Sequence, residues 1–168
     1  MSNLERIGNE KTNLMTSFTK QYLLEQKKQI EQEIKEAKLA IGEGAGSESD
    51  WHDNPAFELA NQQYDMASLK LAIIKEQLSN TIIIKPRMET DRINIGNTII
   101  VKFEDNNETE TFTLLGPNDA ILNSDWISFE SPLGKELLNK KRNDKLSFCV
   151  DNHTSNVQII QILEGQFE

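Results

Sequence analysis

A polar connection, Ser49-Asp50-Trp51-His52-Asp53-Asn54-Pro55-Ala56-Phe57-Glu58, joins two long segments in which apolar residues recur at alternating spacings of three and four. The upstream positions, with one lysine among them, are Leu23, Lys27, Ile30, Ile34, Ala37 and Ile41. The downstream positions are Phe57, Ala60, Tyr64, Ala67, Leu71, Ile74 and Leu78. Two such segments joined by a short polar connection predict an antiparallel coiled-coil hairpin, with Asp50 and Asp53 at its tip.

Glycine, proline and capping residues set the expected limits of the two helices. The first helix is expected from Thr16 to Ile41, because the next five residues, 42–46, contain three glycines. Asp53 or Asn54 is expected to cap the second helix, with Pro55 in its first turn and its end near Ser79. Residues 1–15 lack a clear period and are expected to be loose. The hairpin is thus assigned to residues 1–80, with an acidic tip at about 42–55.

The pattern changes after Asn80, where period-two apolar residues and turn residues indicate strands. Ser131-Pro132 has the cap and first-position chemistry of a short helix, expected to run to about Lys140. The last strand is apolar on both faces and is expected to be central. The expected strands are 93–104, 109–115, 125–130, 145–150 and 156–163. The prediction is an α+β fold, in which the hairpin is followed by a β-rich domain over residues 81–168 with one short helix.

Composition excludes several classes of protein. The chain has 18 Lys and Arg against 27 Asp and Glu, a formal net charge of −9, which argues against a nucleic-acid binder held mainly by phosphate contacts. Its one cysteine, Cys149, excludes an internal disulfide and a cysteine metal pair. No apolar run approaches the roughly 20 residues that span a bilayer. A cytoplasmic monomer without membrane association is expected.

Taken by spacing alone, the tip residues have ordinary explanations as well as functional ones. Asp50 and Asp53 suit solvation and helix capping, as in any exposed turn. Trp51 lies off the heptad positions and could pack within the tip or contact a partner. His52 beside two aspartates is more often a charged neighbour than a metal ligand.

Two motifs resemble the bacterial Gre transcript-cleavage factors. Their tip reads approximately Gly-Asp-Leu-Ser-Glu-Asn-Ala-Glu-Tyr, and Asp50, Trp51, His52, Asp53, Asn54, Pro55 and Phe57 fall on its Asp, Leu, Ser, Glu, Asn, first Ala and Tyr. The stretch Ile127–Lys140, with Ser131-Pro132-Leu133-Gly134 inside it, is similar to the family's Ile-Ser-x-x-Ser-Pro-Leu-Gly-x-Ala-Leu-Leu-Gly-Lys. The order of hairpin, acidic tip and β-rich domain also matches, and the resemblance extends from the first helix to Leu163.

The resemblance implies an FKBP-like C-terminal domain that docks on RNA polymerase and a hairpin that enters the polymerase secondary channel. Asp50 and Asp53 would then help the polymerase to hold a second Mg²⁺ and a water near the nascent RNA 3′ end, so that backtracked RNA is hydrolysed. Trp51, Ser131, Pro132, Leu133 and Gly134 would contact the partner. The chain would have no cofactor of its own and would stimulate an activity of the polymerase.

This chain departs from the family pattern at the tip. Asp53 stands where the family usually has glutamate, and Ala56 replaces a second glutamate. These departures leave open a Gre-like regulator that occupies the channel without stimulating cleavage. A prolyl isomerase, suggested only by the FKBP-like fold, and a coiled-coil adaptor are the remaining alternatives.

Overall fold

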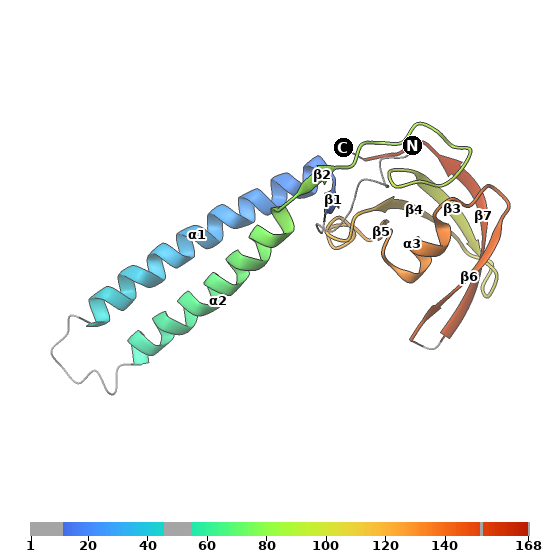
Figure 1. The fold of residues 1–168 in the computed structure, drawn as a ribbon. Coiled ribbons are helices and arrows are strands. Elements are labelled where there is room, and N and C mark those ends of the chain that lie inside the picture. Colours follow the sequence, from blue (N-terminus) through green and yellow to red (C-terminus); the bar gives the residue numbers. More distant parts are fainter. Residues whose placement is uncertain (1–11, 46–54, 152, 168) are drawn as a thin grey trace. The chain divides into compact units, whose positions relative to one another are not determined.

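The structure, a computed structural model, describes residues 12–45, 55–151 and 153–167 (Figure 1). It divides into two compact units. One unit is Gln21–Ser79, and the other combines Met1–Lys20 with Asn80–Glu168. The sequence indicated the division near residue 80, whereas the division near Lys20 falls inside a continuous helix and leaves no trace in the heptad pattern.

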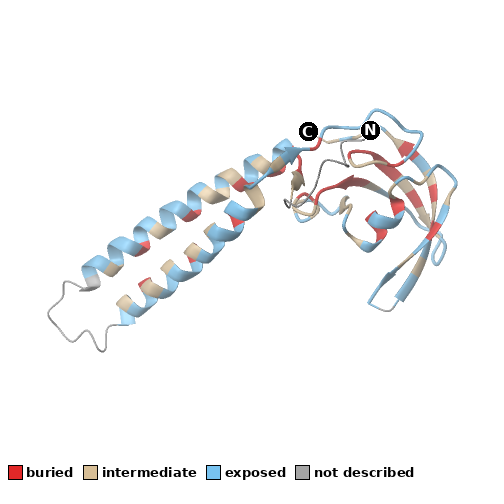
Figure 2. Cartoon of the chain, in the orientation of Figure 1, coloured by how far each residue is buried: buried red, intermediate tan, exposed pale blue. Residues whose placement is uncertain are grey.

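Two long helices form the hairpin, α1 (Ser17–Ala45) and α2 (Pro55–Leu78), and they run side by side in Figure 1. All thirteen predicted heptad positions, six in α1 and seven in α2, are buried or half-buried. We call these thirteen residues the seam, and Figure 2 shows its buried members along the facing sides of the helices. Even Lys27 is half-buried, with its Nζ 3.4 Å from Oε1 of Glu31. The prediction of a helical hairpin is confirmed.

The predicted end of the first helix is wrong. Helix α1 continues past Ile41 through Gly42, Glu43 and Gly44 to Ala45. A glycine inside a helix costs only about 1 kcal/mol relative to alanine, so it weakens a helix without forbidding it. Gly42 and Gly44 therefore lie within the last turns of α1, and Gly46 lies outside the described residues.

The second unit contains a five-stranded sheet in the order β5-β4-β3-β7-β6, with one short helix, α3 (Pro132–Leu137) (Figure 1). Its strands are β3 (Thr98–Phe103), β4 (Thr109–Leu115), β5 (Trp126–Ser128), β6 (Lys145–Val150) and β7 (His153–Leu163). Neighbours are antiparallel except β4 and β5, which are parallel. Ile99, Leu114 and Leu137 are among the fully buried residues of its core. The predicted α+β fold is confirmed.

Three predicted details of this unit need correction. Strand β3 begins at Thr98 and not at Ile93, because Gly96 has a φ of +97° and turns the chain immediately before it. The sheet is centred on β3, and β7 is an interior strand next to it. Helix α3 ends at Leu137, before Lys140, since Asn139 adopts a left-handed φ of 64° and its N–H bonds to the carbonyl of Ile93.

The residues before the first helix are also more ordered than expected. Asn13–Met15 form strand β1, which pairs in parallel with β2 (Thr81–Ile83) in a separate two-stranded sheet. Met15 is fully buried. The expectation of a loose segment is therefore wrong for residues 13–15, because pairing with β2 satisfies a backbone that has no helical period of its own.

Candidate functional site

The hairpin turn contains the acidic residues singled out in the sequence. Helix α1 ends at Ala45 and α2 begins at Pro55, so residues 46–54 connect them. This connection carries Glu48, Asp50 and Asp53 and no Lys or Arg. Asp50, Trp51 and Asp53 lie outside the described residues, and their roles stay predictions.

The described residues beside the turn show how α2 starts. Pro55 is its first residue, where the missing N–H costs no helical hydrogen bond. Phe57 is half-buried on the seam, and its carbonyl accepts a hydrogen bond from Nδ2 of Asn61 at 2.9 Å. Glu58 lies in the first turn, where the helix dipole favours a negative charge. The seam therefore extends to the first turn of α2, directly after the acidic connection.

Carboxylate oxygens are the donors that Mg²⁺ prefers, so the residue types at the tip fit that ion. Two aspartates supply only part of an octahedral ligand set, and the remaining ligands would come from waters or from another molecule. Within residues 12–45, 55–151 and 153–167, no group of three or more His, Cys, Asp or Glu residues is placed to hold a metal ion.

The second motif, Ser131-Pro132-Leu133-Gly134, builds helix α3. Oγ of Ser131 accepts the N–H of Gly134 at 3.0 Å and donates to the carbonyl of Ser128 at 2.7 Å. Leu133 is buried in the core, and a Cβ on Gly134 would lie 2.0 Å from the carbonyl oxygen of Ser128. These residues thus cap α3 and seat it against the end of β5.

The outer side of α3 is exposed at Pro132, Lys135 and Glu136. Of the four motif residues Pro132 alone is exposed, and the other exposed side chains of α3, Lys135 and Glu136, follow the motif. Lys135 and Glu136 were not among the predicted partner-binding residues. The apolar residues Leu133 and Leu137 on either side of them are buried. Their helical spacing could have indicated that Lys135 and Glu136 lie on the exposed side of α3. Partner binding by Ser131, Pro132, Leu133 and Gly134 stays a prediction.

A buried carboxylate that the sequence did not reveal holds the start of α1. Asp119 is fully buried, and its Oδ1 accepts the N–H of Thr16 at 2.9 Å and the hydroxyl of Thr16 at 2.8 Å. Its Oδ2 accepts the N–H of Gly116 at 3.0 Å. Oγ1 of Thr16 in turn accepts the N–H of Thr19 at 3.1 Å and so caps α1. The Thr-x-x-Thr spacing could have indicated the cap, but nothing local indicates its pairing with Asp119.

None of the helices in the described part of the chain has the length and apolar character needed to cross a membrane.

Comparison with known proteins identifies relatives for most of the chain. Residues 88–164 match the family model described as transcription elongation factor, GreA/GreB, C-terminal. Transcription elongation factor GreA of Treponema pallidum is 28% identical over 114 residues, covering 67% of this chain and 70% of that protein. GreA of Christiangramia forsetii is 29% identical over 127 residues, with coverages of 75% and 80%. GreA of Thermotoga maritima is 27% identical over 135 residues, with coverages of 80% and 81%.

Solved structures with a likeness to the chain include GreA factor homolog 1 (Gfh1) of Thermus thermophilus and a GreA/GreB factor of Nitrosomonas europaea. The first is 21% identical, with a TM-score of 0.42 and coverages of 90% of this chain and 99% of that one. The second is 18% identical, with a TM-score of 0.39 and coverages of 63% and 92%.

Proposed function

We propose that this chain, which is similar to the GreA transcription elongation factors over most of its length, is a member of the Gre family that binds RNA polymerase and stimulates hydrolysis of backtracked nascent RNA. In this proposal Asp50 and Asp53 help the polymerase to hold a second Mg²⁺, and the chain acts where transcription takes place, in the cytoplasm. The chain itself is a factor that has no reaction of its own.

One observation supports this function above the others: the seam runs unbroken to the acidic connection. Helix α1 has 29 residues and α2 has 24, so at 1.5 Å per residue the helices are about 43 and 36 Å long. A packed hairpin of this length separates its turn from its base by far more than a small core requires. It is therefore suited to carrying Asp50 and Asp53 into a narrow site on another protein.

The chemistry assigned to the two aspartates is metal binding in a site shared with the polymerase. Each would contribute carboxylate oxygens that help to hold the ion near the RNA phosphodiester. When bound, a second Mg²⁺ supplies an activated water and charge stabilisation for the displacement. Both contributions are greatest in the transition state, so they act on the rate of hydrolysis and little on the binding of the factor.

Docking is assigned to the unit that contains the five-stranded sheet. The helix α3 in this unit carries the Ser131-Pro132-Leu133-Gly134 motif, and Pro132, Lys135 and Glu136 are exposed on it. This assignment leaves the hairpin free to enter the polymerase, so loss of the tip acids should leave the affinity for polymerase nearly unchanged.

A transcript-cleavage assay on a stalled elongation complex with the cognate polymerase tests the proposal. We expect Asp50→Ala or Asp53→Ala to reduce stimulated cleavage hundreds-fold, because several kcal/mol of transition-state stabilisation is lost at about 1.4 kcal/mol per tenfold. Asp65→Ala is the matched control, since it removes an equally charged, exposed carboxylate from the middle of α2. Equal losses from all three variants would contradict a role for the tip.

The tip sequence favours one second candidate, a channel regulator that binds polymerase without stimulating cleavage. Asp53 is one methylene shorter than glutamate, and exposed Ala56 provides no carboxylate in the first turn of α2. Asp53→Glu distinguishes the two candidates. Cleavage should rise if Asp53 reaches the ion poorly and fall if the tip is adapted to aspartate, whereas a regulator without cleavage activity gives no change.

A further inference from the structure

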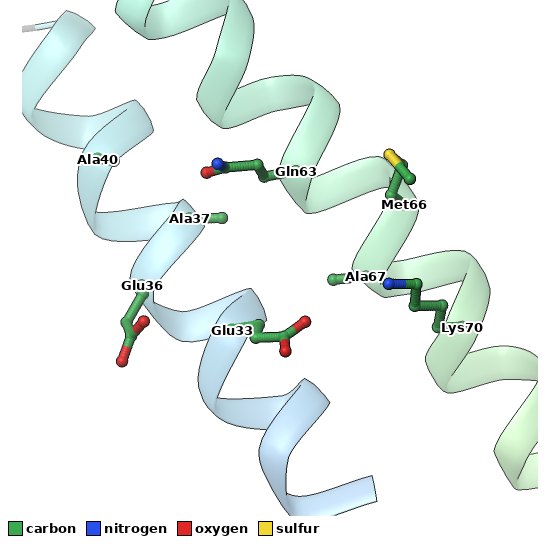
Figure 3. Close-up of a pocket in the computed structure, with 8 residues that line it drawn as sticks. All are labelled: Glu33, Glu36, Ala37, Ala40, Gln63, Met66, Ala67 and Lys70. Atoms are coloured by element: carbon green, nitrogen blue, oxygen red, sulfur yellow. The ribbon is translucent and has the colours of Figure 1, made fainter. Parts of the chain in front are cut away.

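One side of the hairpin contains a groove that the seam does not fill. A cavity of about 510 Å³ lies between α1 and α2, and Ala37 and Ala67 point toward one another across it (Figure 3). Its other lining residues are Glu33, Glu36, Ala40, Gln63, Met66 and Lys70. A second cavity of about 320 Å³ shares Glu33 and Lys70 with the first and continues along the helices to Ile73. Alanine side chains are too short to close this space, so larger apolar groups from outside would fill it.

Large apolar side chains are exposed on the same side of α2. Leu59, Met66 and Ile73 are 55%, 62% and 48% exposed, and they recur at intervals of seven residues. Met66 lines the first cavity and Ile73 lines the second. An apolar row at this spacing is the pattern of a second helix–helix contact. We call the surface formed by Leu59, Met66, Ile73 and the residues that line the two cavities the groove face. It contains unfilled space and also exposed apolar side chains that could fill the same space in another copy.

The row is symmetric about its middle residue. Leu59 and Ile73 lie at equal distances in the sequence on either side of Met66, so the row can pair with an antiparallel copy of itself. A twofold contact requires such self-complementarity, because both copies use the same surface: Leu59 of one copy meets Ile73 of the other, and Met66 meets Met66.

The charges on the groove face fit the same pairing. An antiparallel copy of α2 that is centred on Met66 places its Lys70 beside Gln62. Ala37 lies across the groove from Ala67, so position 62 of α2 is level with residue 42 of α1. Lys70 of one copy then comes next to the exposed Glu43 of the other, and opposite charges meet at both ends of the contact.

We propose that two copies of this chain associate through the groove face, with the α2 helices antiparallel and crossing at Met66. Each α2 lies along the groove of the other hairpin, and the four helices form a bundle. In the monomer–dimer equilibrium that this association implies, the expected monomer is the form whose hairpin is free to enter the polymerase. The association does not depend on the proposed function, because its test contains no polymerase.

Sedimentation equilibrium of the full chain measures the association. We expect a monomer–dimer equilibrium, a dissociation constant raised at least tenfold by Met66→Glu, and no change with Met88→Glu. Met88 is the matched control, since it is 64% exposed and lies in the other unit. A chain that stays monomeric up to about 1 mM, or an equal effect of both substitutions, overturns the proposal.

Two further sets of variants, one of charge reversals and one of cysteine substitutions, test the geometry and do not depend on Met66→Glu being folded. Lys70→Glu should weaken the dimer, and adding Glu43→Lys to the same chain should restore it. In a Cys149→Ser background, Met66→Cys should form a disulfide with itself under oxidation, and Leu59→Cys should crosslink to Ile73→Cys in a mixture of the two variants. Absence of both crosslinks overturns the arrangement.

Discussion

The side chain of Asp119 connects segments that are far apart in the sequence. It accepts hydrogen bonds from Thr16 and Gly116 while fully buried, and hydrogen bonds to a charged group are each worth about 1.5–3 kcal/mol. Asp119→Ala would leave buried donors without partners. We expect it to lower the free energy of unfolding by roughly 3–5 kcal/mol, with Asp119→Asn intermediate, because the amide keeps one acceptor.

Urea denaturation followed by Trp126 fluorescence, in a Trp51→Phe background, measures this loss. Asp105→Ala is the control, since Asp105 is exposed in the turn between β3 and β4 and its removal should change stability by less than about 0.5 kcal/mol. Equal stabilities of the Asp119 and Asp105 variants would show that the buried hydrogen bonds contribute nothing net.

Two glycines should respond to alanine in opposite directions. Gly134→Ala places a Cβ 2.0 Å from the carbonyl oxygen of Ser128 and should destabilise the sheet-containing unit by several kcal/mol, about 3 or more. Gly42 lies inside α1 with nothing within 4 Å of an added Cβ, so Gly42→Ala should stabilise the hairpin by about 1 kcal/mol. Thermal unfolding followed by circular dichroism measures both, and a stabilised Gly134→Ala would refute the steric argument.

These residues show what a sequence can and cannot reveal on its own. The Ser131 cap was predictable, because cap, proline and helix are consecutive in the chain. The pairing of Thr16 with Asp119 was not, because 103 residues separate them and nothing in the sequence near either residue indicates the other. Gly42 was misread because a helix with a packed seam tolerates the small cost of a glycine.

Among the structural elements, the hairpin was the most predictable. Its periodicity is both local and repeated, and every seam position from Leu23 to Leu78 is buried or half-buried as expected. The sheet was less predictable, since strand order depends on contacts between distant segments. Apolar residues on both faces of β7 indicated an interior strand, but they could not indicate that β3 takes the central place.

The length of the hairpin is itself testable. Deleting residues 28–34 from α1 and 70–76 from α2 removes one heptad from each helix and keeps the seam in register, while drawing the tip back by about 10 Å. We expect stimulated cleavage to be lost and polymerase affinity to be retained. Helix content by circular dichroism and competition with the intact chain for polymerase are the controls. Undiminished cleavage by the shortened hairpin would mean that its length does not position the acids.

For the molecule as a whole, the two units are assigned separate tasks. The unit that is proposed to dock includes β1 and the first turn of α1, so a fragment that starts at residue 81 lacks strand β1 and the partner of Asp119. Replacing Gln21–Ser79 with a short flexible linker preserves these parts. We expect this variant to compete with the intact chain for polymerase and to give no cleavage. A complete loss of polymerase binding would assign docking to the hairpin.

The resemblance to a family supplied the predicted function, and physical reasoning from the residues supplied the predicted hairpin and sheet. Spacing alone placed Asp50 and Asp53 at a hairpin tip, where capping explains them equally well. Only the two motifs in their order, with the match over residues 88–164, point to transcription elongation. Ligands that come from a partner protein leave no pattern in this chain, which is why a shared metal site cannot be read from its residues.

The most direct test of the central claim is the rate of RNA cleavage in a stalled complex as Mg²⁺ is titrated, with and without the wild-type chain. We predict that the chain raises the rate at saturating Mg²⁺ and lowers the Mg²⁺ concentration needed for half-maximal cleavage, because its tip carboxylates complete the second ion site. Wild-type protein that binds the polymerase and leaves the cleavage rate unchanged at every Mg²⁺ concentration would contradict this account.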